Sequence, residues 1–261
     1  MLLQLRFLYK KIEWFIRNHR RVLLIDAKTS ANHYLGPITY DTDILTTSNN
    51  CDFIREPRFA QAYKAAADTK PWDGFTSQWR VYIVCWFADH VKNLDGDFVE
   101  CGVNTGAFSR AIIEYVDFNK LNKTFHLLDT FEGFPTQQIT EEERKAGIGI
   151  YATHYHPVYE EVKKTFQGFN VNIIKGMIPD SLEVCKTVKI AFLSIDMNAV
   201  VPEMAAIHYF WDKLVVGGVV ILDDYGFPMH TAQKLAFDEF AQSKNTNILS
   251  LPTGQGIMFK K

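Results

Sequence analysis

The stretch GDFVECGVNTG, residues 96–106, decides the fold expected for the chain around it. Asp97–Cys101 is predicted to form a short strand, and a helix is predicted over residues 108–118. Gly102 permits a tight turn after the strand, and Gly106 lets the helix approach the strand closely. A strand, a glycine-containing turn and a helix in this order are typical of an α/β sheet that binds ligands at the carboxyl ends of its strands.

Short apolar runs alternate with helical segments through the rest of the chain. Further strands are predicted over residues 124–128, 171–175, 190–195, 218–222, 247–251 and 256–259. Helices are predicted over residues 58–67, 77–91, 158–166, 202–214 and 231–242. Buried strands separated by helices indicate a parallel sheet covered on both faces, and the short link 252–255 makes the last two strands a hairpin. The predicted fold class is therefore α/β: a doubly wound, mostly parallel seven-stranded sheet with an antiparallel C-terminal hairpin.

The composition is that of a globular protein. Of the 261 residues, 47% are hydrophobic and 22% charged, which excludes a disordered chain. No uncharged apolar run approaches the roughly 20 residues of a membrane-spanning helix. The four cysteines have no CxxC spacing, so zinc and dithiol sites are not indicated and a reducing, cytoplasmic location is expected. Charges at Arg6 and Lys10 interrupt the first apolar residues, which argues against a secretory signal.

Residues 2–25 are predicted to form a basic amphipathic helix. Residues 1–25 carry six Lys and Arg against one Glu, a net charge of +5, so the rest of the chain carries −7 of the total of −2. This balance argues against a nucleic-acid partner. Two interpretations of the helix stay open: packing on its own domain or on a second copy of the chain, and contact with a membrane surface or a partner. With the loop-rich residues 26–57 it would form an N-terminal extension, residues 1–75, ahead of a main domain at 76–261.

Two acids accompany the glycine turn. Glu100 precedes Gly102, and this pattern is not the GxGxxG fingerprint of dinucleotide-binding proteins. An acid within the turn suits the cationic end of a ligand better than a pyrophosphate. Asp129 ends the next strand, where a carboxylate can accept both hydroxyls of a ribose. Together they favour a nucleoside-containing ligand over the alternatives, a plain strand–turn–helix for the first acid and a turn cap for the second.

Three more carboxylates end two later strands. Asp196 follows the strand at 190–195, and Asp223 and Asp224 follow the strand at 218–222. Adjacent parallel strands would bring these acids together, where their charges repel. A divalent cation relieves that repulsion, and Mg²⁺ prefers such oxygen ligands, to which Asn198 could add one. The alternative is that one or two of the acids point to solvent or cap a helix.

Residues 136–157 form a long excursion between a strand and its helix. Such excursions are often functional, so this segment could be a lid over a substrate. Within it, Glu141, Glu142 and Glu143 are expected on the exposed face of a short helix. His154 and His156 form an HxH pair, which is more often a solvated loop than a metal site.

Four motifs together resemble one family. GDFVECGVNTG (96–106), LDTFEGFP (128–135), IDMN (195–198) and KLVVGGVVILDDYG (213–226) are similar to the macrocin-type O-methyltransferases. The resemblance covers about residues 76–260. It implies a class I methyltransferase domain at 76–261 that uses S-adenosylmethionine and Mg²⁺ and acts on sugar hydroxyls of natural products. The family fold implies the strand order 3-2-1-4-5-7-6.

The resemblance also implies roles for individual residues. Asp196, Asp223 and Asp224 would bind the metal, and Asp129 would hold the ribose. Independently of the resemblance, Asp196 is the first candidate for the group that removes the acceptor proton, as a metal ligand facing the substrate, and His230 is the second, because it lies just beyond residues 223–226. The set expected to bind S-adenosylmethionine comprises Glu100, Gly102, Asn104, Thr105, Gly106, Asp129, Thr130 and Gly176.

The expected partner is a small hydroxylated acceptor that contains a sugar, and a homo-oligomer is one outcome of the N-terminal helix. Two other functions stay open. A nucleotide-linked oxidoreductase could use a similar sheet, although the missing GxGxxG and the terminal hairpin count against it. A non-catalytic protein could bind S-adenosylmethionine and dock through residues 1–25, although the aspartate triad counts against that.

Overall fold

The computed structural model describes residues 37–261. The predicted N-terminal helix at 2–25 lies outside the described residues, as do the interpretations that depend on it. The chain divides into two compact units, residues 1–40 with 47–50 and residues 41–46 with 51–261. In the described part of the first unit, the amide of Thr39 donates to the carbonyl oxygen of Thr47 at 3.0 Å. The second unit contains the central sheet and the helices that cover it.

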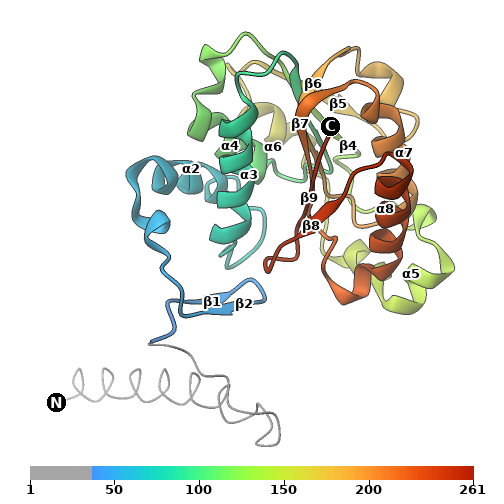
Figure 1. Cartoon of the computed structure of the whole chain (residues 1–261), viewed down its shortest axis with the longest axis horizontal. Coiled ribbons are helices and arrows are strands. Elements are labelled where there is room, and N and C mark those ends of the chain that lie inside the picture. Colours follow the sequence, from blue (N-terminus) through green and yellow to red (C-terminus); the bar gives the residue numbers. More distant parts are fainter. Residues whose placement is uncertain (1–36) are drawn as a thin grey trace, which may run out of the picture. The chain divides into compact units, whose positions relative to one another are not determined.

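Seven strands form the central sheet (Figure 1). They are β3 (Asp97–Cys101), β4 (Phe125–Asp129), β5 (Val171–Lys175), β6 (Ile190–Ile195), β7 (Leu214–Leu222), β8 (Ile248–Ser250) and β9 (Gly256–Phe259). The order across the sheet is β5-β4-β3-β6-β7-β9-β8. The pairs from β5 to β7 are parallel, whereas β9 runs antiparallel to both β7 and β8. This confirms the predicted fold class and the expected order 3-2-1-4-5-7-6.

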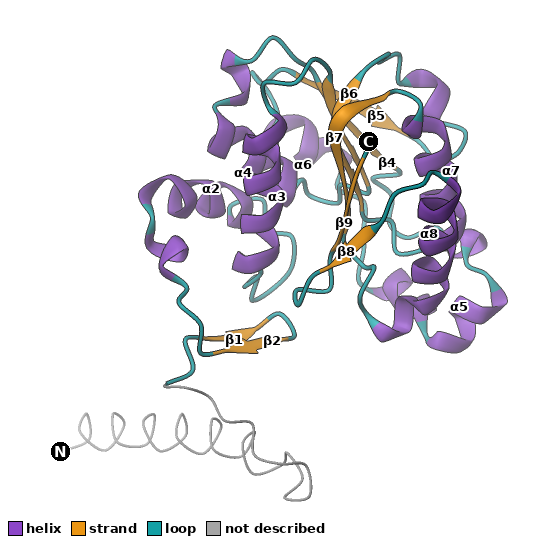
Figure 2. Cartoon of the chain, in the orientation of Figure 1, coloured by secondary structure: helices purple, strands orange, loops and turns teal. Residues whose placement is uncertain are grey.

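Helices cover both faces of the sheet (Figure 2). On one face lie α2 (Pro57–Ala67), α3 (Gln78–Val91), α4 (Ala107–Val116) and α6 (Tyr159–Thr165). On the other lie α7 (Val200–Trp211) and α8 (Thr231–Ser243). Alternate side chains of β3 enter two separate cores: Phe98 packs among Phe118, Phe125 and Phe192, while Val99 belongs to the core under α7 and α8. Burial on both faces is why these strands lack polar alternation.

Several predicted boundaries were wrong by a few residues. The helix predicted to reach residue 118 ends at Val116, because Asp117 adopts a left-handed φ of 54°, and a 3-10 turn, η2 (Phe118–Lys120), follows. The helix predicted at 202–214 is α7, which ends at Trp211, and β7 begins at Leu214 rather than 218. These shifts move no strand end at the carboxyl edge by more than one residue.

The segment predicted to be a loop-rich connection contains local structure. Strands β1 (Tyr40–Thr42) and β2 (Leu45–Thr47) form a two-stranded sheet, and a 3-10 turn, η1 (Asp52–Arg55), precedes α2. The two residues that link β1 to β2, Asp43 and Ile44, have φ of 52° and 62°. Positive φ at both positions is the geometry of a type I′ turn, which Asn-Gly usually occupies, so an isoleucine there is strained.

No helix in residues 37–261 is both long enough and apolar enough to span a bilayer. The cysteines are free thiols, and Cys85 and Cys101 are fully buried as expected.

Candidate functional site

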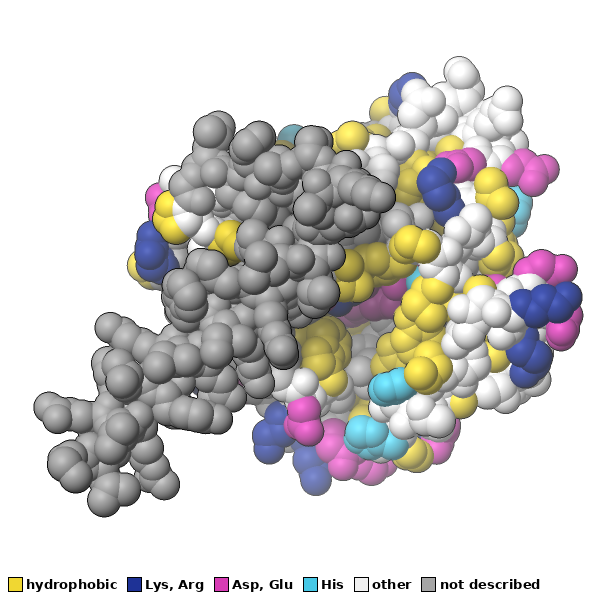
Figure 3. Space-filling model, turned by 90° about the horizontal axis from the view of Figure 1, so that it is seen from below, with side chains coloured by type: hydrophobic (Ala, Val, Ile, Leu, Met, Phe, Trp, Pro, Cys, Tyr) yellow, Lys and Arg dark blue, Asp and Glu magenta, His cyan; other side chains and the backbone are white. Residues whose placement is uncertain are grey.

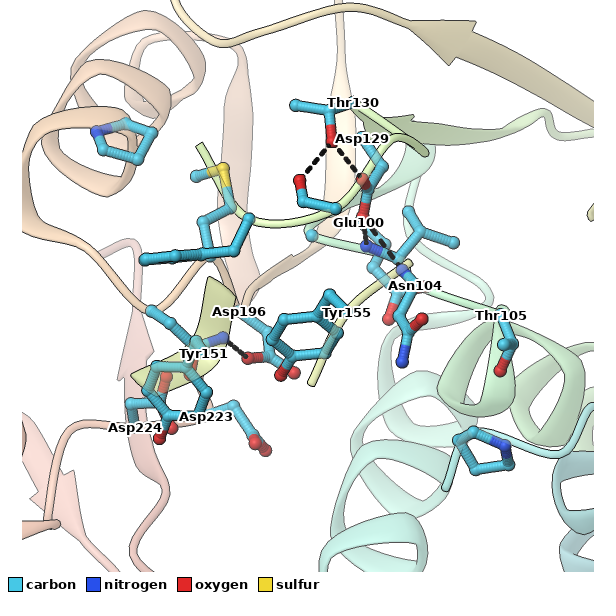
Figure 4. Close-up of a pocket in the computed structure, with 18 of the residues that line it drawn as sticks. Glu100, Asn104, Thr105, Asp129, Thr130, Tyr151, Tyr155, Asp196, Asp223 and Asp224 are labelled. Atoms are coloured by element: carbon cyan, nitrogen blue, oxygen red, sulfur yellow. Dashed lines mark hydrogen bonds between the residues drawn. The ribbon is translucent and has the colours of Figure 1, made fainter. Parts of the chain in front are cut away.

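A cavity of about 550 Å³ opens at the carboxyl ends of the parallel strands (Figure 4). Its floor is made by side chains from four strand ends: Glu100 of β3, Asp129 of β4, Asp196 after β6, and Asp223 with Asp224 after β7. Its walls are mainly apolar and include Trp72, Phe134, Tyr151, Tyr155 and Phe227. On the face seen in Figure 3, hydrophobic side chains border a hollow in which acidic side chains are visible. The cavity therefore combines an apolar wall with an acidic floor.

The glycine turn after β3 is held in a conformation that only glycine tolerates at two positions. Gly102 has φ of 87°, and a Cβ there would lie 1.8 Å from the carbonyl oxygen of Asp196. Gly106 has φ of 88°, and a Cβ there would lie 2.4 Å from the ring of Phe166. Gly102 thus allows the turn to pass against the β6 end, and Gly106 allows α4 to start beside α6.

Asp129 holds the glycine turn in this structure. Its Oδ2 accepts from the amides of Val103 and Asn104 at 2.6 and 2.9 Å, and its Oδ1 accepts from the amide of Phe131 at 2.7 Å. The amides of Val103 and Asn104 are therefore not free donors for a ligand, because they donate to the carboxylate that ends the neighbouring strand. A ribose bound by Asp129 would therefore use the same carboxylate that holds the glycine turn.

Glu100 is buried beneath the cavity and is bonded to the first turn of α4. Its Oε2 accepts from the hydroxyl of Ser109. Burial raises the pKa of Glu100 to about 8, and the carboxylate of Asp129 adds to the rise while the Ser109 bonds oppose it. A cationic group of a ligand placed here would restore the ionised form, because opposite charges at close range favour ionisation.

The other residues expected at the cofactor lie at the same end of the cavity. Asn104, Thr105, Thr130 and Gly176 all line it. Thr105 pairs with the hydroxyl of Thr69 at 2.9 Å, and Thr130 donates to the carbonyl oxygen of Gly133 at 2.8 Å. Gly176 donates its amide to the carbonyl oxygen of Asp129 at 2.9 Å. These contacts fix the shape of the cavity wall that surrounds Asp129.

The aspartate triad is assembled as predicted. Asp196, Asp223 and Asp224 each offer an oxygen, and these oxygens lie within 4.8 Å of one another. Burial, followed by repulsion from the two neighbouring carboxylates, raises the pKa of Asp196 well above its usual range. Burial also raises the pKa of Asp224 to about 6, and Asp223 adds to the rise against the lowering by His230. The alternative that members of the triad face solvent or cap helices was wrong.

Arg80 is a site residue that the sequence analysis missed. It lies in the first turn of α3, its side chain is 13% exposed, and it lines the cavity. Its Nη1 donates to Oδ2 of Asp223 at 2.5 Å, and its Nε and Nη2 donate to the two carboxylate oxygens of Asp43 at 2.8 Å each. A single charge inside the apolar run WRVYIVCWF (79–87) was the available signal.

The triad fits a hard divalent cation. Oδ2 of Asp224 is buried and has no hydrogen-bond partner in the described part of the chain. An unpaired buried carboxylate oxygen is costly, and the donor set contains only oxygens, which Mg²⁺ and Mn²⁺ prefer. The amide of Asn198 approaches Oδ1 of Asp196 at 3.4 Å, so Asn198 turns its nitrogen rather than its oxygen to this carboxylate.

His230 lies behind the cavity wall. It is fully buried, and its Nδ1 is bonded to Oε1 of Gln233. Its Nε2 lies 3.1 Å from the hydroxyl of Tyr151 and 3.9 Å from Oδ1 of Asp224. The amide oxygen of Gln233 can only accept a hydrogen bond, so Nδ1 of His230 carries the proton between them. Tyr151 lines the cavity and lies between it and His230. His230 is therefore a partner of the site rather than a group that lines it.

The predicted lid segment, residues 136–157, folds over one side of the cavity. It contains η3 (Thr136–Gln138), α5 (Glu141–Ala146) and η4 (Ile148–Thr153), and it supplies Gln138, Tyr151 and Tyr155 to the wall. The expectation that Glu143 is exposed was wrong. Glu143 is 1% exposed, since it forms a capping box with Thr140 and accepts from the amide of Val200 at 2.7 Å.

The HxH pair forms no metal site with a third ligand among the described residues. The aspartate triad is the only group of three or more potential metal-ligating side chains found there. His154 is exposed, and its Nδ1 lies 2.9 Å from the carbonyl oxygen of Ile150. His156 is also exposed at the rim of the cavity.

The fold is shared with known methyltransferases. The O-methyltransferase NovP superposes with a TM-score of 0.61 at 22% identity, over 70% of this chain and 79% of that chain. The calicheamicin methyltransferase CalS11 superposes with a TM-score of 0.56 at 14% identity, over 84% of this chain and 99% of that chain. At these identities the likeness establishes the fold.

Two curated relatives match part of the chain. Mycinamicin III 3''-O-methyltransferase of Micromonospora griseorubida is 24% identical over 147 residues, 51% of this chain and 56% of that protein. Demethyldecarbamoylnovobiocin O-methyltransferase of Streptomyces niveus is 28% identical over 147 residues, 51% of this chain and 54% of that protein. The chain thus spans about half the length of the curated relatives it matches.

The family model described as Macrocin-O-methyltransferase (TylF) matches residues 54–254. This range contains the glycine turn, the end of β4 and the whole aspartate triad. The chain belongs to the macrocin O-methyltransferase family.

Proposed function

We propose that this chain transfers a methyl group from S-adenosylmethionine to a hydroxyl of a sugar or glycosylated natural product, and that it requires Mg²⁺. Family membership supports the reaction class. The relatives named for methylation of mycinamicin III and demethyldecarbamoylnovobiocin support the acceptor class. The same membership argues against the oxidoreductase alternative.

One observation carries the proposal: the glycine turn and the aspartate triad line a single cavity. The methyl donor fits the end with Glu100 and Asp129, where a buried carboxylate would face its cationic portion. The acceptor fits the end with Asp196, Asp223 and Asp224, against the aromatic wall. This leaves donor and acceptor side by side, which is the arrangement that an in-line displacement needs.

The triad residues Asp196, Asp223 and Asp224 would hold the cation, which when bound acidifies an acceptor hydroxyl and orients it. Asp196 is proposed to take the proton, because it lies at the cavity floor beside the glycine turn, between the proposed positions of donor and acceptor. The oxygen–carbon bond forms as the carbon–sulfur bond breaks. Tyr151 and Tyr155 exclude water from this end, and Tyr151 connects it to His230.

The domain organisation is also a proposal, with the methyltransferase domain at 76–261 and an extension at 1–75. Helix α2 precedes that boundary, yet Phe59, Ala62 and Ala66 of α2 are fully buried in the core with α3 and α4. A fragment that starts at residue 76 is therefore expected to be less stable than one that includes α2.

Titration and turnover test the proposed function. Purified full-length protein is titrated calorimetrically with S-adenosylhomocysteine and, separately, with NAD. It is then incubated with S-adenosylmethionine labelled in the methyl group and a panel of glycosylated acceptors and their aglycones. We expect binding of S-adenosylhomocysteine, no binding of NAD, and label in a glycosylated acceptor. Binding without transfer to any hydroxylated acceptor would favour the non-catalytic alternative.

A further inference from the structure

The acidic floor of the cavity contains a basic side chain of its own. Among the described residues that line the cavity, Arg80 is the only lysine or arginine. It contacts Asp223 and Asp43 at once, so it bridges the triad to the turn between β1 and β2. The other two triad members, Asp196 and Asp224, have no such bond to Arg80.

The bonds to Arg80 differ on its two sides. Asp43 receives a bidentate fork, with Nε and Nη2 each 2.8 Å from a carboxylate oxygen, and this geometry is the strongest that an arginine makes. Asp223 receives the single remaining nitrogen, Nη1. Loss of the Asp223 bond would therefore leave Arg80 anchored by the fork.

Each oxygen of Asp223 already accepts from a donor in the metal-free protein. Its Oδ2 accepts from Arg80, and its Oδ1 accepts from Nε2 of Gln255 at 3.0 Å. Asp224, the next residue, has a buried oxygen with no partner. Each carboxylate oxygen has a second lone pair, so a cation bound by all three aspartates would coordinate Asp223 close to one of these two donors. Of the two donors, Arg80 carries the charge that repels a cation.

We propose that Arg80 is a displaceable counter-ion of the triad: it neutralises Asp223 in the metal-free protein and yields Asp223 to the divalent cation, while the fork to Asp43 retains it beside the site. Arg80 thus acts as a positioning residue. The inference rests on the proposed function, because it assumes that the triad binds a metal.

Two substitutions should have opposite effects. Arg80→Gln removes the competing charge, so the triad should bind a divalent cation about tenfold more tightly. Asp43→Asn removes the carboxylate that competes with Asp223 for Arg80, so Arg80 should bind Asp223 more firmly and metal affinity should fall several-fold. By reciprocity, the metal should raise the unfolding temperature of Arg80→Gln by more than that of the wild type.

The test is a titration of the full chain with Mn²⁺, in which free Mn²⁺ is followed by its paramagnetic signal. Wild type, Arg80→Gln and Asp43→Asn are compared with Lys189→Gln, which removes an equal charge from an exposed residue next to the amino end of β6. S-adenosylhomocysteine binding, measured without metal, verifies that each variant is folded. Thermal unfolding with and without Mn²⁺ gives the second readout.

The outcomes separate the inference from the function it assumes. Tighter binding in Arg80→Gln and weaker binding in Asp43→Asn, with Lys189→Gln unchanged, support the proposal. Equal affinity in all four proteins, or weaker binding in Arg80→Gln, overturns it and leaves the metal site standing. No saturable binding to the wild type overturns the metal assignment as well. If Arg80→Gln does not fold, Asp43→Asn alone decides, and an unchanged or higher affinity there contradicts the proposal.

Discussion

The two ends of strand β3 carry carboxylic acids whose environments shift their pKa values in opposite directions. At the amino end, Asp97 accepts from the amide of Thr124 and the hydroxyl of Thr187 at 2.9 Å each, and it lies 3.2 Å from Nε2 of His126. Burial alone would raise the pKa of Asp97, but these bonds outweigh it and lower the pKa. At the carboxyl end, three residues along, burial dominates and raises the pKa of Glu100 to about 8.

The contrast extends across the sheet. Beside Asp97, burial lowers the pKa of His126, yet the hydrogen bond to Asp97, together with Cys185, outweighs burial and brings the value to about 9. Beside Glu100, the carboxyl edge gathers Asp196 and Asp224, whose pKa values are raised. Perturbed carboxylates of this kind concentrate at sites that act on ligands. The acid at the amino edge stabilises the fold. The acids at the carboxyl edge are costly to ionise on their own, and a bound cation or a cationic methyl donor would favour their ionised forms.

The largest effect is expected from Asp224→Asn. The substitution removes one ligand of the proposed metal, so methyl transfer should fall about 100-fold or more. It also removes a buried carboxylate with an unpaired oxygen, so the metal-free protein should become more stable above about pH 6, the pKa of Asp224. Turnover with labelled donor and thermal unfolding at pH 8 measure the two effects. Loss of both activity and stability would show instead that Asp224 stabilises the fold.

Glu100→Gln should reveal the burial cost of the carboxylate below the cavity. Folding raises the pKa of Glu100 from 4.5 to about 8, so the wild type loses stability progressively as pH rises through that range. The variant should match the wild type near pH 4.5 and exceed it by about 2–4 kcal/mol at pH 8 and above. It should also bind S-adenosylmethionine about tenfold more weakly, which calorimetry would detect. A variant that is less stable at pH 8 would show that the ionised carboxylate is paired.

Asp97→Asn at the amino edge should lower the stability of the fold, whereas Glu100→Gln should raise it. Because folding lowers the pKa of Asp97, its ionised form stabilises the fold above the ordinary value of 3.8. Because folding raises the pKa of His126, its protonated form stabilises the fold fully below pH 6.5, and this stabilisation is lost as the pH rises to about 9. The variant should therefore lose about 1–3 kcal/mol of folding free energy, most clearly near pH 5–6, where both partners are charged. Activity per folded molecule should stay unchanged. A fall in kcat with unaltered stability would contradict the contrast between the two edges.

The smallest effect is expected from His154→Ala. His154 is exposed and bonded within its own loop, so stability should change by less than about 0.5 kcal/mol and Mn²⁺ affinity should not change. His156→Ala is the matched variant at the cavity rim. A weaker Mn²⁺ affinity in either one would make the HxH pair a candidate metal ligand again.

Periodicity and turn chemistry were enough to predict the sheet. Uninterrupted apolar strands such as Ile190–Ile195 are separated by helices, and a parallel sheet then brings all the carboxyl ends to one edge. For this reason the sequence alone predicts that Glu100, Asp129 and the aspartate triad lie together. The strand order itself came from the family resemblance, because sequence spacing does not specify which strands are neighbours.

Side-chain partners from distant segments could not be predicted. Arg80 reaches Asp223 across 143 positions and Asp43 across 37, and no local pattern links these residues. Asp129 lines the cavity where a ribose was expected, and its additional bonds to the glycine turn of the adjacent strand had no signal in the sequence. Glu143 looked like one of three solvated glutamates, and only the packing of α5 on the start of α7 reveals that it is buried. In each case the partner of the side chain is set by a contact between residues far apart in the sequence, which local sequence patterns do not indicate.

Methyl transfer measured before and after chelation is the most direct test of metal-dependent transfer at this site. The protein is treated with EDTA, and donor binding and turnover are measured in parallel, then again after addition of Mg²⁺. Because Glu100 and Asp129 lie on other strands than the triad, chelation should abolish transfer and leave S-adenosylhomocysteine affinity nearly unchanged. Added Mg²⁺ should restore transfer in the wild type but not in Asp224→Asn. Full turnover after rigorous chelation would contradict a metal-dependent reaction.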